Sequence, residues 1–464
     1  MRIQQRSLQQ RSLQQRSLSW FLRRLALPLG DLVLGQRMMQ RLQFLEQAQW
    51  WPAERVEEHR NKLLSKVIQI SGTEVPFYRA LWDSRGAAWR DIARAEDLTR
   101  LPVTTKSMMR PAYPHATTRN TGQKTYEACS SGSTGANFCV QEDAETAGWY
   151  RASFFLALQW AGWQFGESHV QTGITSLRSP EKKMKDLLLQ CHYVPAFDLS
   201  DTSLDATLEL MDRRAIRHLW GYPGGLHLLA ERAKAKGWNR PLASVVTWGD
   251  NLYQHYRQSM EQAFSTRVFD TYGCSEGMQI AAQCGHGDHY HIHSLDVVAE
   301  FVDESGNPVP AGEPGNIVLT RLHPGPTPLI RYAIGDVGIA PQAKKCPCGR
   351  GFELMRSIQG RDTDIVVTPT GNRIIVHAFA GVLEFFPELQ CFQVVQKERD
   401  LLFVRVVMEE GHAFSRDLER RIILSLAEKG ISDMRIVIEP VADIPATKSG
   451  KRRFVISELP RVFG

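Results

Sequence analysis

Hydrophobic and polar residues follow two different periods along the middle of the chain. From about Asp97, short runs rich in β-branched residues alternate with segments whose apolar residues recur at helical spacing. Clear examples, in chain order, are VQTGITS, EKKMKDLLLQ, DATLELMDRRAIRHLWG and PLASVVTWGD. Strands that alternate with amphipathic helices in this way predict βαβ units.

Two later regions have other patterns. The segment HIHSLDVVAEFVDESGNPVPAGEPGNIVLTRL contains adjacent strands joined by a Gly-Asn-Pro turn and a Gly-rich turn, which predicts an antiparallel sheet. After Ile358, helices and strands mix again, for example in QCFQVVQKERDLLFVRVVM and SRDLERRIILSLAEKG. We therefore expect a mixed α/β (α+β) fold, with a large domain at residues 19–358 and a small, mobile α+β domain at residues 359–464.

The N-terminal region predicts a tail followed by helices. Residues 1–18 contain the repeat RIQQRSLQQRSLQQRSL, which has no acidic residue and no contiguous apolar face, so we expect disorder. Such a start also suits a transit peptide, but a translated nucleotide repeat or a misassigned start codon fits better. The next segment, SWFLRRLALPLGDLVLG, is apolar and basic enough to lie on a membrane surface; we favour a packed helix broken at Pro28. From Met38 to Ser71 the spacing is helical.

Composition narrows the class of protein. A chain of 464 residues exceeds the size at which one core keeps growing, so more than one domain is expected. It has no run of eighteen apolar residues that could span a bilayer, and much of its net charge of +6 comes from six arginines among the first 24 residues. We therefore expect no nucleic-acid partner and no transmembrane segment. Eight cysteines without a signal peptide indicate reduced thiols in the cytoplasm, where clustered cysteines more often bind metal.

The stretch ACSSGSTGANFCV, residues 128–140, is suited to binding an anion. Its hydroxyl residues are Ser130, Ser131, Ser133 and Thr134, and its glycines are Gly132 and Gly135. Glycines allow successive backbone N–H groups to converge on one point, and the hydroxyls add donors. The loop joins a predicted strand, QKTYEA, to a predicted helix, EDAETAGWYRASFFLALQW, so a phosphate is the expected ligand. It lacks the lysine of a Walker loop, and a plain flexible turn is the alternative.

Two turns carry residues that suit a nucleotide. VFDTYGCSEGMQ places Tyr272, Gly273, Ser275 and Glu276 at a strand end, where open α/β sheets bind ligands. An aromatic ring can stack on a base, and a carboxylate can hold Mg²⁺ through water. PLIRYAIGDVG puts Asp336 in a turn after a strand, where its carboxylate can accept both hydroxyls of a ribose. A common Tyr-Gly turn and a surface Asx-turn are the structural alternatives.

Two basic residues near the C-terminus extend this set. Arg361 in IQGRD can reach the same sugar or a phosphate, and Lys451 in PATKSGKRRF can swing onto a developing phosphate charge. A run such as GKRR is otherwise usually a solvated face.

Taken together, from Trp51 to the C-terminus, these motifs resemble those of the adenylate-forming (AMP-forming ligase) superfamily, and most closely the phenylacetate-CoA ligase family with its capsule-cluster members. The resemblance implies that the loop at residues 130–135 holds ATP phosphates, that the YGxSE turn binds adenine and Mg²⁺, and that Asp336 binds ribose. Lys451, Glu276 and Thr134 are then the catalytic residues. TWGDNL, with Gly249 and Asp250, matches the family's turn beside adenine, and LWGYPGGL matches its segment beside the acyl pocket.

Two departures from the family pattern matter. The loop continues as GANF where the family usually has Gly-Lys-Pro, so we expect weaker ATP binding. After Arg361 the chain reads Asp362-Thr363-Asp364, whereas the family's hinge acid sits two positions after the arginine. We take Asp364 as the pivot of the small domain.

A cysteine and histidine cluster predicts a metal site. Its histidines are His286, His289, His291 and His293. Cys284 precedes them, and CPCGRG supplies a CxC pair about sixty residues later, which is a fair Zn²⁺ pattern. Some members of the resembled family carry a structural zinc at this place. The predicted ligands are Cys284, His291, Cys346 and Cys348, with His286 as the substitute for His291. Buried free cysteines are the alternative, and Cys129 and Cys274 are interpreted as small packing residues.

The resemblance implies an ATP-dependent carboxylate ligase that forms an acyl-adenylate, releases pyrophosphate and passes the acyl group to a thiol, most readily coenzyme A. Its expected cofactors are ATP, Mg²⁺, coenzyme A and a structural Zn²⁺, its partners a small carboxylic acid and a thiol acceptor, with a homodimer left open. Transfer to an amine or hydroxyl in capsular polysaccharide or natural-product biosynthesis is the first alternative. A non-catalytic nucleotide-binding partner protein is the second, against which Lys451 argues.

Overall fold

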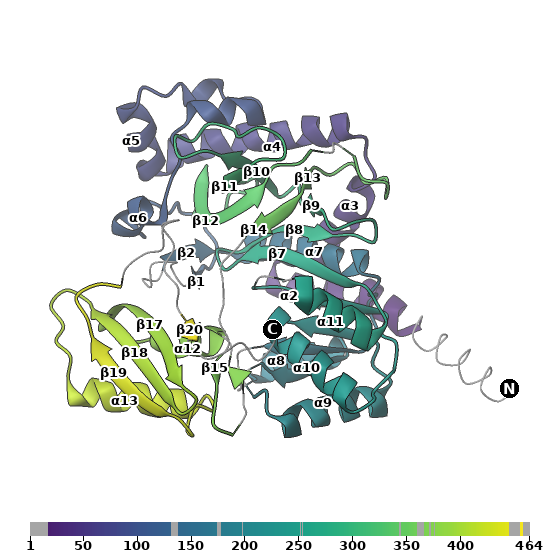
Figure 1. Ribbon diagram of the computed structural model, residues 1–464. Coiled ribbons are helices and arrows are strands. Elements are labelled where there is room, and N and C mark those ends of the chain that lie inside the picture. The colour runs from purple at the N-terminus through teal and green to yellow at the C-terminus, as the bar shows by residue number, and fades with distance from the viewer. Residues whose placement is uncertain are drawn as a thin grey trace, which may run out of the picture. The chain divides into compact units, whose positions relative to one another are not determined.

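The computed structural model describes residues 17–130, 138–173, 178–196, 198–250, 252, 254–342, 345–359, 366–370, 373–374, 376–444 and 455–457 (Figure 1). The chain forms two compact units. The first comprises Met1–Ser130, Phe138–Glu167 and Phe269–Gly360, and the second comprises Ser131–Asn137, Ser168–Val268 and Arg361–Gly464. No helix in the described part of the chain combines the length and the hydropathy that crossing a bilayer requires.

Most helices of the first unit come from its N-terminal part. They are η1 (Leu22–Ala26), α2 (Leu27–Leu34), α3 (Met38–Ala48), α4 (Ala53–Glu74), α5 (Pro76–Ser84), η2 (Trp89–Asp91), η3 (Ala95–Arg100), α6 (Lys106–Met109), η4 (Arg110–Ala112) and α7 (Ala144–Trp160). The start of α7 is fixed by a capping box, in which the Asp143 carboxylate accepts the Thr146 N–H at 2.9 Å and the Thr146 hydroxyl accepts the Asp143 N–H at 3.1 Å. The predicted helix is confirmed, but the predicted strand-to-helix connection is wrong, because strand Phe138–Glu142 lies between the Ser/Gly loop and the helix.

The predicted helix break at Pro28 is wrong. Residues 17–34 are helical throughout, and Pro28 lies in the first turn of α2. A proline inside a helix lacks an N–H, and its ring collides with the carbonyl four residues earlier. Here the preceding η1 is a π-helical turn, in which the Leu27 N–H bonds to the Leu22 carbonyl. This wider turn relieves the collision, so the helix continues.

The strands of the first unit are antiparallel. The hairpin β1 (Tyr126–Ser130) and β2 (Phe138–Glu142) carries the Ser/Gly loop at its tip. A four-stranded sheet has the order β10 (Val297–Val302), β11 (Pro314–Arg321), β12 (Tyr332–Ile339), β14 (Ser357–Gln359). Four further strands follow the order β13 (Leu354–Met355), β9 (Tyr290–Ile292), β8 (Met278–Gln283), β7 (Val268–Cys274). The antiparallel pairing predicted for residues 291–322 is confirmed by β10 and β11.

The second unit contains the predicted βαβ units. Its parallel strands are β3 (His169–Gly173), β4 (Cys191–Pro195), β5 (His218–Gly221) and β6 (Ser244–Thr247), in the order β6-β5-β3-β4. The helices are α8 (Pro180–Leu188), α9 (Asp201–Arg214), α10 (Pro223–Ala235) and α11 (Gln254–Phe264). Figure 1 shows α9, α10 and α11 grouped together. Their apolar side chains share one core with those of the strands.

The C-terminal part of this unit buries a core of its own. Its elements are β15 (Val366–Val367), β16 (Arg373–Ile374), α12 (Val376–Leu383), β17 (Leu389–Glu398), β18 (Leu401–Met408), α13 (Arg416–Ala427), β19 (Arg435–Pro440) and β20 (Val455–Ser457). The sheet order is β19-β18-β17-β20, with β17 and β18 antiparallel. Phe379, Ile422 and Leu402 belong to a core drawn entirely from residues 366–455.

Candidate functional site

The turn between β7 and β8 is shaped by a buried glutamate. Gly277, in this turn, has a φ of +78°, and a Cβ there would lie 2.8 Å from the carboxyl carbon of Glu142. Only glycine therefore fits both the backbone conformation and the space. The register shifts where Tyr272 pairs with Ala281 and Gly273 pairs with Gln279, so Ile280 is an extra residue of β8, and β8 bends just after the turn that carries Glu276.

Glu276 is buried and neutralised by a lysine. Its side chain is 1 % exposed, and its Oε1 lies 3.1 Å from Nζ of Lys106. The same oxygen accepts a hydrogen bond from the hydroxyl of Tyr332 at 2.6 Å. The ring of Tyr332 stacks on Phe138, the first residue after the Ser/Gly loop in the described chain. A carboxylate held in this way is suited to receive Mg²⁺, with the lysine beside it available to an anionic ligand.

A buried ion pair supports this turn. Nη1 of Arg321 lies 2.6 Å from Oε1 of Glu142, and both side chains are 2 % exposed. The other amino group of Arg321 donates to the backbone carbonyl of Glu276. Arg321 ends β11 and Glu142 ends β2, so the pair ties the turn to two strands. Sequence reasoning missed Lys106, Glu142 and Arg321; a charged residue at the end of an apolar run such as NIVLTR is the one signal of such a pair.

Asp336 lies within a strand, and the predicted turn after a strand is wrong. In β12, Ala333 pairs with Val318 and Val337 pairs with Asn316, so the three residues from 334 to 336 face a single residue of β11. This bulge contains Gly335, whose φ is +95°. It presents the half-buried Asp336, whose Oδ2 accepts a hydrogen bond from the hydroxyl of Tyr272 at 2.8 Å. The structure thus brings together the residues predicted to bind adenine and ribose.

Glycines at the carboxyl ends of the parallel strands of the second unit allow close packing. Gly221 ends β5, and a Cβ there would lie 1.9 Å from Oγ1 of Thr172. Gly249 follows β6 with a φ of +77°, and its Cβ would lie 2.7 Å from the ring of Tyr222. Asp250 comes next and is half-buried. The TWGD and GYPGG segments therefore lie together at the sheet edge where α/β proteins bind ligands.

Several predicted residues lie outside the described part of the chain. They are Ser131, Gly132, Ser133, Thr134, Gly135, Arg361 and Lys451. Ser130 is the last residue of β1 and pairs with Phe138. Next to this pair, Cys129 and Cys139 form a disulfide. The interpretation of Cys129 as a reduced packing residue is wrong, because the antiparallel register places the two cysteines directly opposite each other.

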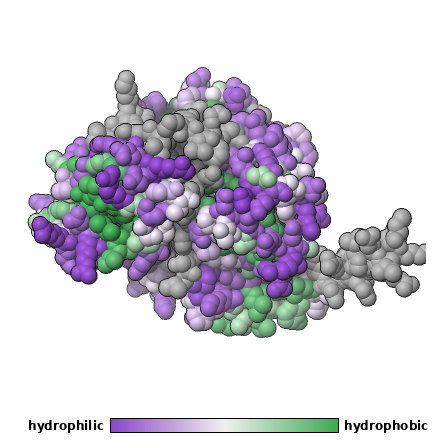
Figure 2. Space-filling view, turned by 60° about the horizontal axis from the view of Figure 1, so that its bottom comes forward, coloured by the Kyte–Doolittle hydropathy of each residue, from purple (hydrophilic) through white to green (hydrophobic). Residues whose placement is uncertain are grey.

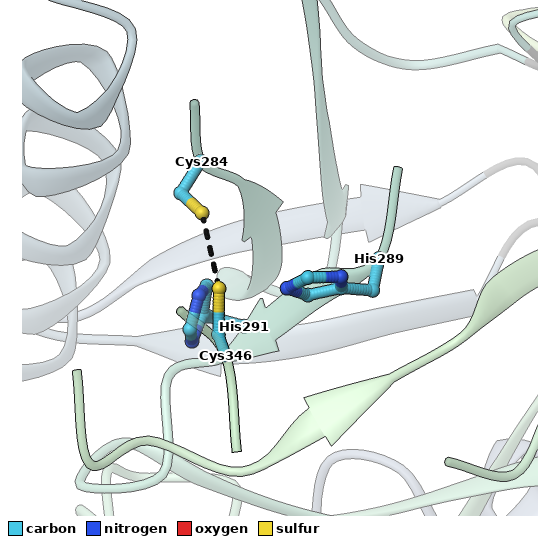
Figure 3. Close-up of side chains that lie close together, drawn as sticks. All are labelled: Cys284, His289, His291 and Cys346. Atoms are coloured by element: carbon cyan, nitrogen blue, oxygen red, sulfur yellow. Dashed lines mark hydrogen bonds between the residues drawn. The ribbon is translucent and has the colours of Figure 1, made fainter. Parts of the chain in front are cut away.

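The cysteine and histidine cluster is assembled in the first unit. Cys284, His289, His291 and Cys346 have ligand atoms that all lie within 4.8 Å of one another. Figure 3 shows these four side chains converging, with the sulfurs of Cys284 and Cys346 3.7 Å apart. Of the other predicted ligands, Cys348 lies with its sulfur 3.3 Å from Nε2 of His291. His286 approaches the group through its backbone carbonyl, 3.8 Å from the Cys346 sulfur.

The protonation states fit a metal. Burial lowers the pKa of His291 to about 3, so its imidazole is neutral at pH 7 and can act as a ligand. Burial also raises the pKa of Cys284, and it raises the pKa of Cys346 to about 12. Both groups are therefore neutral thiols at pH 7 unless a bound cation displaces their protons, and thiolate and imidazole are the ligands that Zn²⁺ prefers.

Two family models match parts of the chain. Residues 189–323 match the family model of AMP-binding enzymes, and residues 366–458 match the CapK C-terminal domain. These two parts of the chain are therefore similar to AMP-forming enzymes, in agreement with the resemblance seen in the sequence motifs. The chain is 22% identical to the phenylacetate-coenzyme A ligase of Thermus thermophilus, over 87% of this chain and 97% of that one. It is 23% identical to the phenylacetate-coenzyme A ligase of Aromatoleum evansii, over 83% and 91%.

Solved structures show the same fold. The chain superimposes on 2-hydroxyisobutyryl-CoA ligase in complex with 2-HIB-AMP and CoA in the thioesterification state with a TM-score of 0.61, at 19% identity and over 89% of this chain and 92% of that one. The postadenylation state of that enzyme with 2-HIB-AMP gives a TM-score of 0.57 at 20% identity, with the same coverage. The predicted fold class is confirmed.

Proposed function

We propose that the protein is an ATP-dependent carboxylate ligase that makes an acyl-adenylate and then a thioester of coenzyme A. The observation that carries this proposal is the constellation in the first unit, in which Tyr272 contacts Asp336 and the adjoining turn presents Glu276 beside Lys106. An aromatic ring, a ribose-binding carboxylate, a metal-binding carboxylate and a cation are the groups that a Mg-nucleotide needs.

The reaction divides into two displacements. A carboxylate oxygen of the acid attacks the α-phosphorus of ATP, and pyrophosphate leaves. The thiol of coenzyme A then attacks the acyl carbonyl, and AMP leaves. Because both steps move negative charge, the protein chiefly aligns the reactants and neutralises that charge. Mg²⁺, when bound, neutralises phosphate oxygens.

Each candidate residue has a role in this scheme. Asp336 orients the ribose, Tyr272 packs on adenine, and Glu276 binds Mg²⁺. The loop at residues 130–135, including Thr134, holds the phosphates, with Gly249, Asp250 and Arg361 around the nucleotide and Lys451 on the α-phosphate in the transition state. Lys106 supplies a cation near Glu276 in a chain whose phosphate loop lacks the lysine of its family.

The cluster of Cys284, His289, His291 and Cys346 is proposed to hold a structural Zn²⁺, with Cys348 as the competing fourth ligand. A site closed by four protein ligands leaves no position for a substrate, which assigns it to stability and not to the reaction. A cytoplasmic location, where ATP and coenzyme A are available, is part of the proposal.

A second acceptor class is favoured by one observation, the match of residues 366–458 to the CapK C-terminal domain. In that case the same adenylate passes its acyl group to an amine or hydroxyl in polysaccharide or natural-product assembly.

Pyrophosphate release, measured across a panel of carboxylic acids, tests the first half-reaction. Coenzyme A added to the active acids should give a thioester detectable by mass spectrometry, together with AMP. Adenylation followed by transfer to an amine or hydroxyl, but not to coenzyme A, would support the second acceptor class. Nucleotide binding without pyrophosphate release for any acid would instead support a non-catalytic role.

A further inference from the structure

The N-terminal helix exposes hydrophobic side chains to solvent. In the described part of the chain, 14 large hydrophobic side chains are exposed, and seven of them lie on residues 20–34. Six form a stripe that we term the apolar face: Trp20, Phe21, Leu25, Leu29, Leu32 and Val33. Leu32 is 80% and Val33 is 85% exposed. Figure 2 shows hydrophobic side chains gathered along the lower edge of one face of the molecule.

The spacing makes this stripe continuous. Phe21, Leu25, Leu29 and Val33 follow one another at intervals of four, so they lie on one side of the helix. A helix covering residues 17–34 is about 27 Å long at 1.5 Å per residue. The apolar face is therefore long enough to rest along a surface.

The other side of the same helix attaches it to the protein, partly through polar groups. Leu22 is buried, and the carboxylate of buried Asp31 accepts the backbone N–H of Met39. Arg23 forms an ion pair with Glu46 of α3 at 2.6 Å. A surface helix of a globular protein normally directs its apolar side to the core. This helix directs most of its apolar side chains away from it.

Positive charge lies next to the apolar face. Arg24 and Arg37 line an open depression of about 360 Å³ between α2 and α3, together with Asp31 and with Arg23, which is paired with Glu46. The first 24 residues contain six arginines, and the first acidic residue of the chain is the buried Asp31. An apolar stripe flanked by arginines is complementary to anionic lipids, whose phosphates attract the charges while the headgroup boundary accepts the apolar side chains.

We propose that the N-terminal helix is an interfacial anchor that holds the protein on the surface of an anionic phospholipid membrane. The apolar face lies in the boundary between headgroups and acyl chains, and the arginines contact lipid phosphates. A second copy of this chain is a poorer occupant, because pairing two apolar faces brings two arginine-rich, acid-free segments together. The anchor is independent of the proposed ligase reaction.

Flotation of the full chain with vesicles tests this anchor. The protein should float with vesicles that contain phosphatidylglycerol and stay behind with vesicles of phosphatidylcholine alone. The double variant Leu29→Ser/Leu32→Ser should weaken partitioning about 100-fold or more, because each leucine removes several buried CH₂ groups. Arg24→Gln/Arg37→Gln should weaken it about 25-fold at low salt, and the difference should shrink at high salt.

The matched control is Met184→Ser/Leu187→Ser, which removes two side chains of α8 that are 58% and 68% exposed. This control should float as the parent does, and circular dichroism should show all variants folded. An equal loss of vesicle binding in the control variant would show that binding depends on exposed hydrophobic side chains in general, and it would contradict the proposed anchor. Failure of the parent protein to bind anionic vesicles would also contradict the proposed anchor. So would a parent that sediments as a dimer and becomes monomeric with Leu29→Ser/Leu32→Ser, which would assign the apolar face to a second copy.

Discussion

Replacement of Arg321 by methionine should destabilise the first unit through the buried carboxylate that it leaves behind. The guanidinium of Arg321 contacts Glu142 at 2.6 Å, and neither side chain is more than 2 % exposed. Methionine matches much of the volume but provides no charge and no donor. Glu142 then stays buried without its partner, and the Glu276 carbonyl loses a charged donor.

The expected loss follows from these two changes. Removing one member of a buried pair costs about 3–5 kcal/mol, because the other charge is left uncompensated. A lost hydrogen bond from a charged donor falls at the upper end of the ordinary range, about 1.5–3 kcal/mol, part of which is already included in that figure. We therefore expect about 4 kcal/mol for Arg321→Met. The double variant Arg321→Met/Glu142→Leu should lose much less than the sum of the two single variants.

Urea unfolding followed by tryptophan fluorescence measures these differences in a double-mutant cycle. Arg232→Met is the control, since Arg232 contacts Asp205 at 2.7 Å with both side chains partly exposed, and it should change the unfolding midpoint little. A loss below about 1 kcal/mol for Arg321→Met, or additive effects in the double variant, would refute the reasoning. ATP–pyrophosphate exchange should also fall in Arg321→Met, because the turn that carries Glu276 loses its support.

Further predictions concern the reaction, the metal, the hinge and pH. Lys451→Ala should slow adenylation by about two orders of magnitude or more with nearly unchanged ATP affinity; unchanged pyrophosphate exchange would remove the lysine from its role. Elemental analysis should find about one zinc per chain, and chelation should lower stability; absence of metal, with normally titrating thiols, would contradict this. Asp364→Pro should impair thioester formation more than adenylation in single-turnover assays, whereas equal slowing would move the pivot to Asp362 or Thr363. Burial raises the pKa of Asp296 to about 6, so this carboxyl group stabilises the folded state at low pH, and its contribution is lost as pH rises through about 6. Asp296→Asn should therefore flatten the dependence of the free energy of unfolding on pH in that range. An unchanged dependence on pH in the variant would show that Asp296 is not its cause.

Local patterns were readable from the sequence, whereas contacts between distant segments were not. Helix α7 and the antiparallel pairing of β10 with β11 were predicted because hydrophobic period and turn residues act over a few neighbours. The ion pair of Glu142 and Arg321 joins residues 179 positions apart, and the sequence around each residue does not indicate which partner it has. The bulge at Asp336 depends on the register of a neighbouring strand, so a Gly-Asp pair was interpreted as a turn. The exposure of Leu32 and Val33 could not be predicted either, because hydrophobic periodicity identifies the apolar face of a helix but not whether another segment covers that face.

Residues 366–455 contain a core of their own, so reorientation of this segment costs little free energy. The residues of this core are buried against one another, so a change in the orientation of the segment leaves the core itself intact. Two orientations then differ only by the surface contacts that they exchange. Moving such an equilibrium from 1:99 to 99:1 takes about 5.5 kcal/mol of differential affinity, which a bound nucleotide or acyl-adenylate can supply. We therefore expect that the chemical state of the ligand can change the arrangement of the segment without unfolding its core.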